Sequence, residues 1–199
     1  MYLKTGKRFL DIMMAATGLI ILSPLFLFLT ILLYFTNDGH PFFLQARPGL
    51  NERIFTLIKF RTMTSLKTEQ GFILPDIQRI TYIGNLLRKT SLDEIPQLLN
   101  VLKGDMSLVG PRPLLPEYLK LYNPDQRKRH KVLPGITGWA QIRGRNFLSW
   151  EEKFEFDLWY VENRSFKLDM KIIFLTVMSV VNRKGINQNK DKCMEKFTG

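Results

Sequence analysis

The chain has 199 residues, which suffices for one compact domain and a short membrane element but not for two full-sized domains. Its net charge of +11 allows three classes of partner: nucleic acid, anionic lipid headgroups and phosphorylated substrates. The sequence has no zinc finger, no aromatic RNA-binding motif and no low-complexity basic tail, which argues against nucleic acid. The single cysteine, Cys193, cannot form an internal disulfide, and His40 and His130 make no zinc-like cluster, so we expect a reducing, cytosolic setting for the soluble part.

The first predicted element is a membrane anchor. No residue from Ile12 to Phe35 is charged, and at about 1.5 Å per helical residue this run is long enough for a hydrocarbon core of roughly 30 Å. The run is too long for a signal peptide, so we interpret it as a retained anchor. Lys7 and Arg8 precede it as a basic flank that would face lipid headgroups.

Ser23 and Pro24 interrupt the anchor near its midpoint. A proline inside a helix removes a backbone hydrogen bond and costs roughly 3 kcal/mol, and no water satisfies the freed carbonyl in hydrocarbon. Ser23 can donate to that carbonyl. The segment before Ser23 makes about 16 Å of helix, roughly half the hydrocarbon depth. Two structures therefore fit: a kinked helix that crosses the membrane, and a broken helix that returns to the side it entered from.

The rest of the chain is predicted to be mostly helical. Residues 53–60 are rich in β-branched and aromatic side chains and predict a strand after a turn at 48–51. We expect helices over residues 77–88, from Asp93 through Leu102 with Gly104 as the stop, over 116–130 with its basic side chains in solvent, and over 167–183. The last of these is apolar around nearly its whole circumference, which fits either a core helix or a helix lying in the headgroup region.

Two adjacent carboxylates, Asp93 and Glu94, are the candidate chemical centre. Ser91 followed by Glu94 has the spacing of a helix capping box. Pro96 argues against that register, because only a helix starting at Asp93 places the proline safely inside the first turn. Adjacent carboxylates repel and need a nearby cation, a metal or a helix N-terminus. This segment alone favours capping over catalysis.

Five motifs in a fixed order carry a family resemblance. They are QARPG at 45–49, KFRTM at 59–63, SLDEIPQ at 91–97, GPRP at 110–113 and PGITGWAQ at 134–141. Through them the sequence, over almost its whole length, resembles the bacterial sugar transferases, the monotopic phosphoglycosyl transferases that start glycan assembly on a polyprenol phosphate. The chain is similar to the small, minimal form of that family.

The resemblance implies an α/β fold, mostly helical with little strand. It implies a re-entrant membrane helix over residues 1–36, broken at Ser23 and Pro24, a cytosolic catalytic domain with amphipathic interface helices over 37–186, and a C-terminal tail over 187–199. It further implies transfer of a phosphosugar from a UDP-sugar to polyprenol (undecaprenyl) phosphate, with UMP released and Mg²⁺ required. The expected location is the bacterial inner (cytoplasmic) membrane, with the catalytic domain facing the cytoplasm. Inner-membrane lipids and later glycosyltransferases of the same pathway are expected partners.

The same resemblance assigns roles to individual residues. Asp93 is the expected nucleophile and Mg²⁺ ligand, and Glu94 the helper of a second step, as a base or as an orienting group. The expected substrate-binding residues are Lys59, Arg88, Pro111, Arg112, Pro113, Gln141, Arg145, Asp157 and Asp169. The arginines among them carry the planar fork that matches phosphate oxygens. Arg143 stands where a small polar residue is expected, which leaves the sugar specificity open.

Two other functions fit parts of the sequence. A non-enzymatic bitopic scaffold, whose basic domain binds partners or lipids, would not depend on Asp93 or on Mg²⁺. A glycosyltransferase that uses the nucleotide sugar directly is the enzymatic alternative, but the sequence contains no Asp-x-Asp metal motif to support it.

Overall fold

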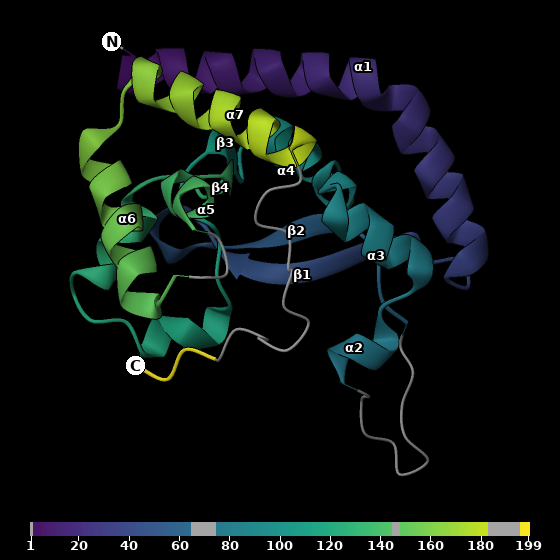
Figure 1. Ribbon diagram of the computed structural model, residues 1–199. Coiled ribbons are helices and arrows are strands. Elements are labelled where there is room, and N and C mark those ends of the chain that lie inside the picture. Colours follow the sequence, from purple (N-terminus) through teal and green to yellow (C-terminus); the bar gives the residue numbers. More distant parts are fainter. Residues whose placement is uncertain (1, 65–74, 145–147, 183–195) are drawn as a thin grey trace.

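The membrane anchor forms one long bent helix. The computed structural model describes residues 2–64, 75–144, 148–182 and 196–199 (Figure 1). A π-helical segment, Tyr2–Gly6, leads into α1, Lys7–Thr36, which bends along its length and contains Pro24. Pro24 has no N–H for the carbonyl of Ile20, and the Ser23 hydroxyl donates to that carbonyl at 2.8 Å. The prediction that Ser23 satisfies the freed carbonyl is confirmed.

Both halves of α1 pack against the same domain. In the N-terminal half, Asp11 and Ala15 are buried, and the Asp11 carboxylate accepts a hydrogen bond from the backbone N–H of Leu108 at 3.0 Å. In the C-terminal half, Leu29 and Leu33 are buried in a core cluster of the domain. Each half is therefore tied to the domain by its own contacts.

The remaining surface of α1 is exposed and apolar. Its large exposed side chains are Phe9, Ile12, Met13, Ile20, Ile21, Leu27, Phe28, Ile31, Tyr34 and Phe35. Among the described residues α1 is the one helix whose length and composition would allow it to cross a membrane. An apolar surface of this extent on a water-facing helix would be unfavourable, so it indicates a lipid environment.

A β-hairpin follows α1. Strand β1, Phe42–Pro48, pairs antiparallel with β2, Ile54–Phe60, so that Phe42 lies opposite Phe60. The predicted strand at 53–60 is confirmed as β2, whereas β1 was not predicted, because its sequence lacks the alternation of a half-buried strand. Figure 1 shows β1 running away from the end of α1.

A second, small sheet joins two of the sequence motifs. Strands β3, Ser107–Val109, and β4, Gly135–Thr137, are parallel and three residues long. The Gly110 N–H donates to the Thr137 carbonyl at 2.9 Å. A Cβ atom on Gly135 would lie 2.1 Å from the Gly110 nitrogen, so only glycine allows this backbone approach. The GPRP and PGITG motifs are thus held side by side.

Helices and 3₁₀ segments cover these sheets. Their bounds are α2 Asp76–Arg79, α3 Tyr82–Lys89, η3 Leu92–Glu94, α4 Gln97–Lys103, η4 Pro116–Lys120, η5 Gln126–Lys131, α5 Trp139–Arg143, α6 Trp150–Asn163 and α7 Phe166–Val181. The structure bears out a mostly helical chain with little strand. Figure 1 shows α7 lying beside the N-terminal half of α1.

Three predicted helix boundaries were wrong. The helix over 77–88 is split, because Ile80 bridges to Met63 and Thr81 caps a new helix by accepting from the Gly84 N–H. The helix after the carboxylates begins at Gln97, since Pro96 has no N–H to give to a helical ladder. The segment 116–130 forms two separate 3₁₀ stretches.

The helix predicted over 167–183 is confirmed as α7, and it serves both of the roles considered for it. Ile172 is fully buried in the core, whereas Phe174, Val177 and Met178 are exposed. One side of α7 therefore packs on the domain and the other presents an apolar surface.

The end of the C-terminal tail folds onto the domain. Phe197 is buried in an aromatic cluster with Tyr118, Tyr122, Trp150 and Phe154. Most of the predicted tail, up to residue 195, lies outside the described residues.

Candidate active site

A cavity of about 1400 Å³ opens between the β1–β2 hairpin, α3, η3 and α7. Basic side chains dominate its polar lining: Arg47, Lys59, Arg61, Arg79, Arg88, Lys89, Arg112, Arg129 and Lys153. The acidic side chains of the lining are Asp93, Glu94 and Asp157. Such an excess of positive charge suits a polyanionic substrate.

Glu94 is held between two cations. Its Oε1 atom accepts from Lys59 Nζ at 2.7 Å and from Arg112 Nη2 at 2.6 Å. Burial alone would raise the pKa of Glu94, but the charges of Arg112 and Lys59 outweigh burial and hold the pKa well below its ordinary value. Glu94 is therefore an ionised carboxylate that positions Lys59 and Arg112.

Asp93 differs from its neighbour although the two are adjacent in sequence. Its carboxylate lines the cavity, is 9% exposed and accepts no hydrogen bond from the described residues. Burial and the charge of Glu94 raise the pKa of Asp93, opposed by the charges of Lys59, Arg112 and Arg88. Because Asp93 lies in the 3₁₀ segment η3 and not at the start of α4, these cations, not a helix dipole, favour its ionised form.

Arg88 is a third cation of the cavity lining whose charge favours the ionised form of Asp93. It stands in the last turn of α3, and its Nε donates to the Thr62 hydroxyl at 2.8 Å. Arg88 lines the cavity, and its two terminal guanidinium nitrogens make no hydrogen bond with the described residues. They are available to a phosphate oxygen.

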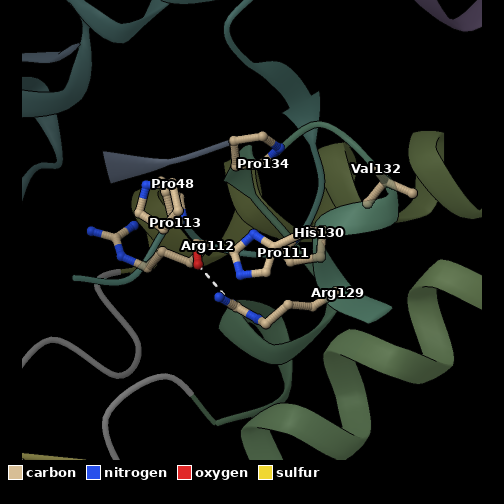
Figure 2. A pocket seen from close by; sticks show the side chains of 8 residues that line it. All are labelled: Pro48, Pro111, Arg112, Pro113, Arg129, His130, Val132 and Pro134. Carbon is tan, nitrogen blue, oxygen red and sulfur yellow. Dashed lines mark hydrogen bonds between the residues drawn. The ribbon is translucent and has the colours of Figure 1, made fainter. Parts of the chain in front are cut away.

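A buried ion pair supports the loop that carries Arg112. Arg129 donates to the backbone carbonyl of Arg112 at 2.7 Å and to the Asp157 carboxylate at 2.6 Å, as Figure 2 shows for the first of these bonds. Pro111 and Pro113 flank Arg112 and limit its backbone. Asp157, predicted to bind substrate, lies in the cavity wall and acts on Arg112 through Arg129.

Gln141 also lines the cavity. Both polar atoms of its amide are buried and lack a hydrogen-bond partner among the described residues. Buried amide atoms are nearly always paired, so a water molecule or a ligand has to supply the partner. The placement agrees with the predicted role of Gln141 in substrate binding.

Asp169, Lys7 and Arg8 lie away from the cavity lining. Asp169 is buried and accepts from Lys7 Nζ at 2.7 Å and from the Tyr160 hydroxyl at 2.8 Å. Arg8 donates to two backbone carbonyls of α4, at 2.6 and 3.0 Å. These side chains fasten the start of α1 to α7 and α4. Their predicted roles, substrate binding for Asp169 and headgroup contact for Lys7 and Arg8, stay predictions.

Two arginines follow the PGITGWAQ motif, and the structure describes only one of them. Arg145, a predicted phosphate-binding residue, lies outside the described residues. Arg143 stacks on the Trp139 ring, with its guanidinium carbon 4.3 Å from the ring centroid, and does not line the cavity.

Sequence reasoning missed Arg47 and Arg129. Arg47 belongs to the QARPG motif, which was a usable signal. Arg129 belongs to a run of basic residues that was expected to face solvent, yet Arg129 and His130 are both buried. Nothing local distinguishes Arg129 from its exposed neighbours, because its partner Asp157 is 28 residues away.

The comparisons with known proteins identify the family of this chain. Residues 2–183 match the family described as "Bacterial sugar transferase". The chain is 56% identical over 194 residues to "Uncharacterized sugar transferase EpsL" of Bacillus subtilis, covering 97% of this chain and 96% of that protein. It is 39% identical to "Exopolysaccharide production protein ExoY" of Rhizobium meliloti, covering 90% and 87% of the two chains.

A third relative is much longer than this chain. "Undecaprenyl-phosphate galactose phosphotransferase" of Salmonella typhimurium is 39% identical over 197 residues, which cover 90% of this chain and 41% of that protein. The family match extends over most of the sequence and includes Asp93, Glu94 and the cationic residues around them. The chain therefore belongs to the bacterial sugar transferase family.

Proposed function

We propose that this sugar transferase moves a phosphosugar from a UDP-sugar to polyprenol phosphate and releases UMP. The observation that carries the proposal is the contrast within the Asp93–Glu94 pair: Glu94 is engaged by Lys59 and Arg112, whereas Asp93 faces the cationic cavity without a hydrogen bond from the described residues. Relatives named as undecaprenyl-phosphate galactose phosphotransferase and UDP-galactose-lipid carrier transferase support this choice of substrates.

In the first step, a carboxylate oxygen of Asp93 attacks the sugar-bearing phosphorus of the UDP-sugar. A bond forms between Asp93 and phosphorus, the bond from phosphorus to the bridging oxygen breaks, and UMP leaves with the electron pair. Arg112, Lys59 and Arg88 surround Asp93 and offset the negative charge that gathers on the phosphate oxygens. The product is a phosphosugar attached covalently to Asp93.

In the second step, a phosphate oxygen of the polyprenol phosphate attacks the same phosphorus. The bond to Asp93 breaks, the Asp93 carboxylate is regenerated, and the lipid diphosphosugar is released. Glu94 has a lowered pKa and two cationic partners, so it is a poor proton acceptor. Of its two predicted roles, the contacts support orientation of Arg112 and Lys59.

We also propose that the reaction uses Mg²⁺. Among the described residues, no three aspartate, glutamate, histidine or cysteine side chains form a group that could hold a metal ion. Mg²⁺ is commonly bound by one or two carboxylates together with substrate phosphates and water, so Asp93 and the donor diphosphate fit it. When bound, the ion supplies positive charge against the phosphate oxygens.

We further propose that α1 enters the bacterial inner membrane and returns to the cytoplasmic side. Asp11 near one end and Leu33 near the other are both buried against the single domain. A helix that crossed the membrane would have to give up one of these sets of contacts. Pro24 allows the helix to bend, and the Ser23 hydroxyl satisfies the Ile20 carbonyl that Pro24 leaves without a backbone partner.

Cysteine labelling tests this topology. In a Cys193→Ser background, Lys4→Cys and His40→Cys place a thiol before and after α1, and His40 is exposed. A membrane-impermeant maleimide should label neither cysteine in intact cells and both after the cells are opened. Arg53→Cys, in the domain, is the matched control and should behave in the same way. Labelling of one end of α1 from outside would establish a membrane-crossing helix.

A product assay tests the reaction. The purified protein is incubated with a panel of UDP-sugars, polyprenol phosphate and Mg²⁺, and UMP and UDP are measured separately. We expect UMP together with a lipid diphosphosugar for at least one donor, and no product when a chelator removes the metal. Release of UDP would show direct glycosyl transfer, and absence of both nucleotides across the panel would favour the scaffold function.

A further inference from the structure

Arg47 is a cavity residue with no acidic partner. Its Nη2 donates to the Gln45 side-chain oxygen at 2.6 Å and its Nη1 to the Pro113 carbonyl at 3.4 Å, both neutral acceptors. Its Nε is buried and has no hydrogen-bond partner in the part of the chain that the structure describes. In the described part of the chain, no carboxylate accepts a hydrogen bond from Arg47, unlike Arg112, which contacts Glu94.

Arg47 also lies close to a second cation. The bond to Pro113 ties it to the residue that follows Arg112. Burial and the positive charge of Arg112 lower the pKa of Arg47 to about 10, although Glu117 opposes this shift. A half-buried cation beside another cation is unfavourable unless an anion joins them. Among the described residues, Glu94 contacts the guanidinium group of Arg112, and no carboxylate contacts that of Arg47.

The position of Arg47 indicates which anion it binds. Strand β1 starts at Phe42, whose ring contacts Phe26 in the C-terminal half of α1, and runs away from that half of the helix (Figure 1). Five residues of strand at about 3.3 Å each place Arg47 roughly 17 Å farther along. A polyprenol phosphate is held in the bilayer by its chain, whereas a UDP-sugar arrives from water. The end of β1 that carries Arg47, which is the end farther from Phe42 and Phe26, is therefore suited to the water-soluble donor.

We propose that Arg47 and Arg112 together bind the nucleotide phosphate of the donor, the phosphate that leaves as part of UMP. This inference rests on the proposed function and names one subsite within it. The leaving phosphate is one bridging oxygen from the phosphorus that Asp93 attacks, so its subsite has to adjoin Arg112. The leaving phosphate gains negative charge as the bond from the bridging oxygen to the attacked phosphorus breaks. Two guanidinium groups therefore stabilise this phosphate more in the transition state than in the bound donor.

Two-substrate kinetics separate this role from a general loss of activity. In a two-step displacement, kcat/KM for each substrate reports only the half-reaction that the substrate enters. Arg47→Met should lower kcat/KM for the UDP-sugar by about ten- to a hundredfold, the range for losing hydrogen bonds to a charged group. It should lower kcat/KM for the polyprenol phosphate by a smaller factor, because an attacking phosphate loses negative charge in the transition state whereas the leaving UMP phosphate gains it. Arg47→Lys, which keeps the charge but not the fork, should fall between.

Arg53→Met is the matched control. Arg53 lies on the same hairpin, is exposed and does not line the cavity. Its removal lowers the net charge by the same amount and should change neither kcat/KM value. An equal effect of Arg53→Met and Arg47→Met would mean that overall charge attracts the donor, and would overturn the subsite.

Direct binding of UMP tests the subsite without catalysis. In an Asp93→Asn background, calorimetry should show UMP affinity reduced about ten- to a hundredfold by Arg47→Met. If that variant melts at a lower temperature, Arg47→Lys carries the measurement. Unchanged UMP affinity, or a loss confined to the polyprenol phosphate, would overturn the proposal. A wild-type protein that released no UMP from any donor would instead contradict the proposed reaction, while UMP binding still tests Arg47.

Discussion

Replacing Asp93 with asparagine is expected to abolish both UMP release and covalent labelling of the protein by a UDP-sugar with a labelled sugar. Asparagine keeps the shape of the side chain but has no anionic oxygen to attack phosphorus. Removal of an enzyme nucleophile typically lowers kcat by about 10⁴-fold or more. Labelling is measured by gel after denaturation, and UMP by chromatography.

The fold should survive this substitution. Asp93 accepts no hydrogen bond from the described residues, and its pKa is raised, which means that the folded protein disfavours the charged form. The neutral asparagine should therefore leave the melting temperature unchanged or higher. Asp125→Asn is the matched control, because Asp125 is an exposed partner of Lys128, and it should keep full activity. An Asp93→Asn protein that turned over near the wild-type rate would rule out the covalent mechanism.

Glu94→Gln is expected to block formation of the lipid product while leaving part of the covalent labelling. The glutamine amide oxygen can still accept hydrogen bonds but carries no charge to neutralise Lys59 and Arg112, both of which contact a single oxygen of Glu94. Breaking a buried ion pair typically costs about 3–5 kcal/mol, which corresponds to a factor of roughly 150 to 5,000. The lipid product is measured by extraction, and the protein-bound sugar by gel. Full lipid product from this variant would contradict any role for Glu94.

A double-mutant cycle distinguishes the two roles considered for Glu94. If Glu94 acts by orienting Arg112, then Glu94→Gln and Arg112→Met remove the same interaction, and the double variant should lose much less than the sum of the two. If Glu94 were a base, the losses would add, and Glu94→Gln would remove one limb of the pH–rate profile. Additive losses with a changed pH profile would therefore exclude the orienting role.

The parts of this protein that sequence alone predicted share one property: they depend on neighbours along the chain. The apolar run of α1 and the apolar periodicity of α7 identify these helices because a helix repeats its faces every few residues. The Ser23 hydroxyl reaches the carbonyl freed by Pro24 because both belong to one turn. Strand β2 was predicted from its own β-branched and aromatic residues.

Boundaries that depend on distant contacts were predicted less well. The interruption between α2 and α3 depends on the bridge from Ile80 to Met63, which stands 17 positions earlier in the sequence. The partners of Asp157 and Asp169 depend on how α6 and α7 pack against η5 and α1. The sequence alone does not distinguish a charged side chain that binds substrate from one that forms a buried ion pair or one that faces water.

By itself, the sequence determined the membrane helix with its proline, the adjacent carboxylates and the ordered motifs of a bacterial sugar transferase, because these are local patterns of residue type and spacing. Only the tertiary structure decided which of these two cavity carboxylates is held by cations and which accepts no hydrogen bond from the described residues. Asp93 and Glu94 are neighbours of similar chemistry. They differ because Lys59 of β2 and Arg112 of the loop after β3 both donate hydrogen bonds to Glu94. The strength of a charge interaction depends on distance and burial in space, which the order of residues does not specify.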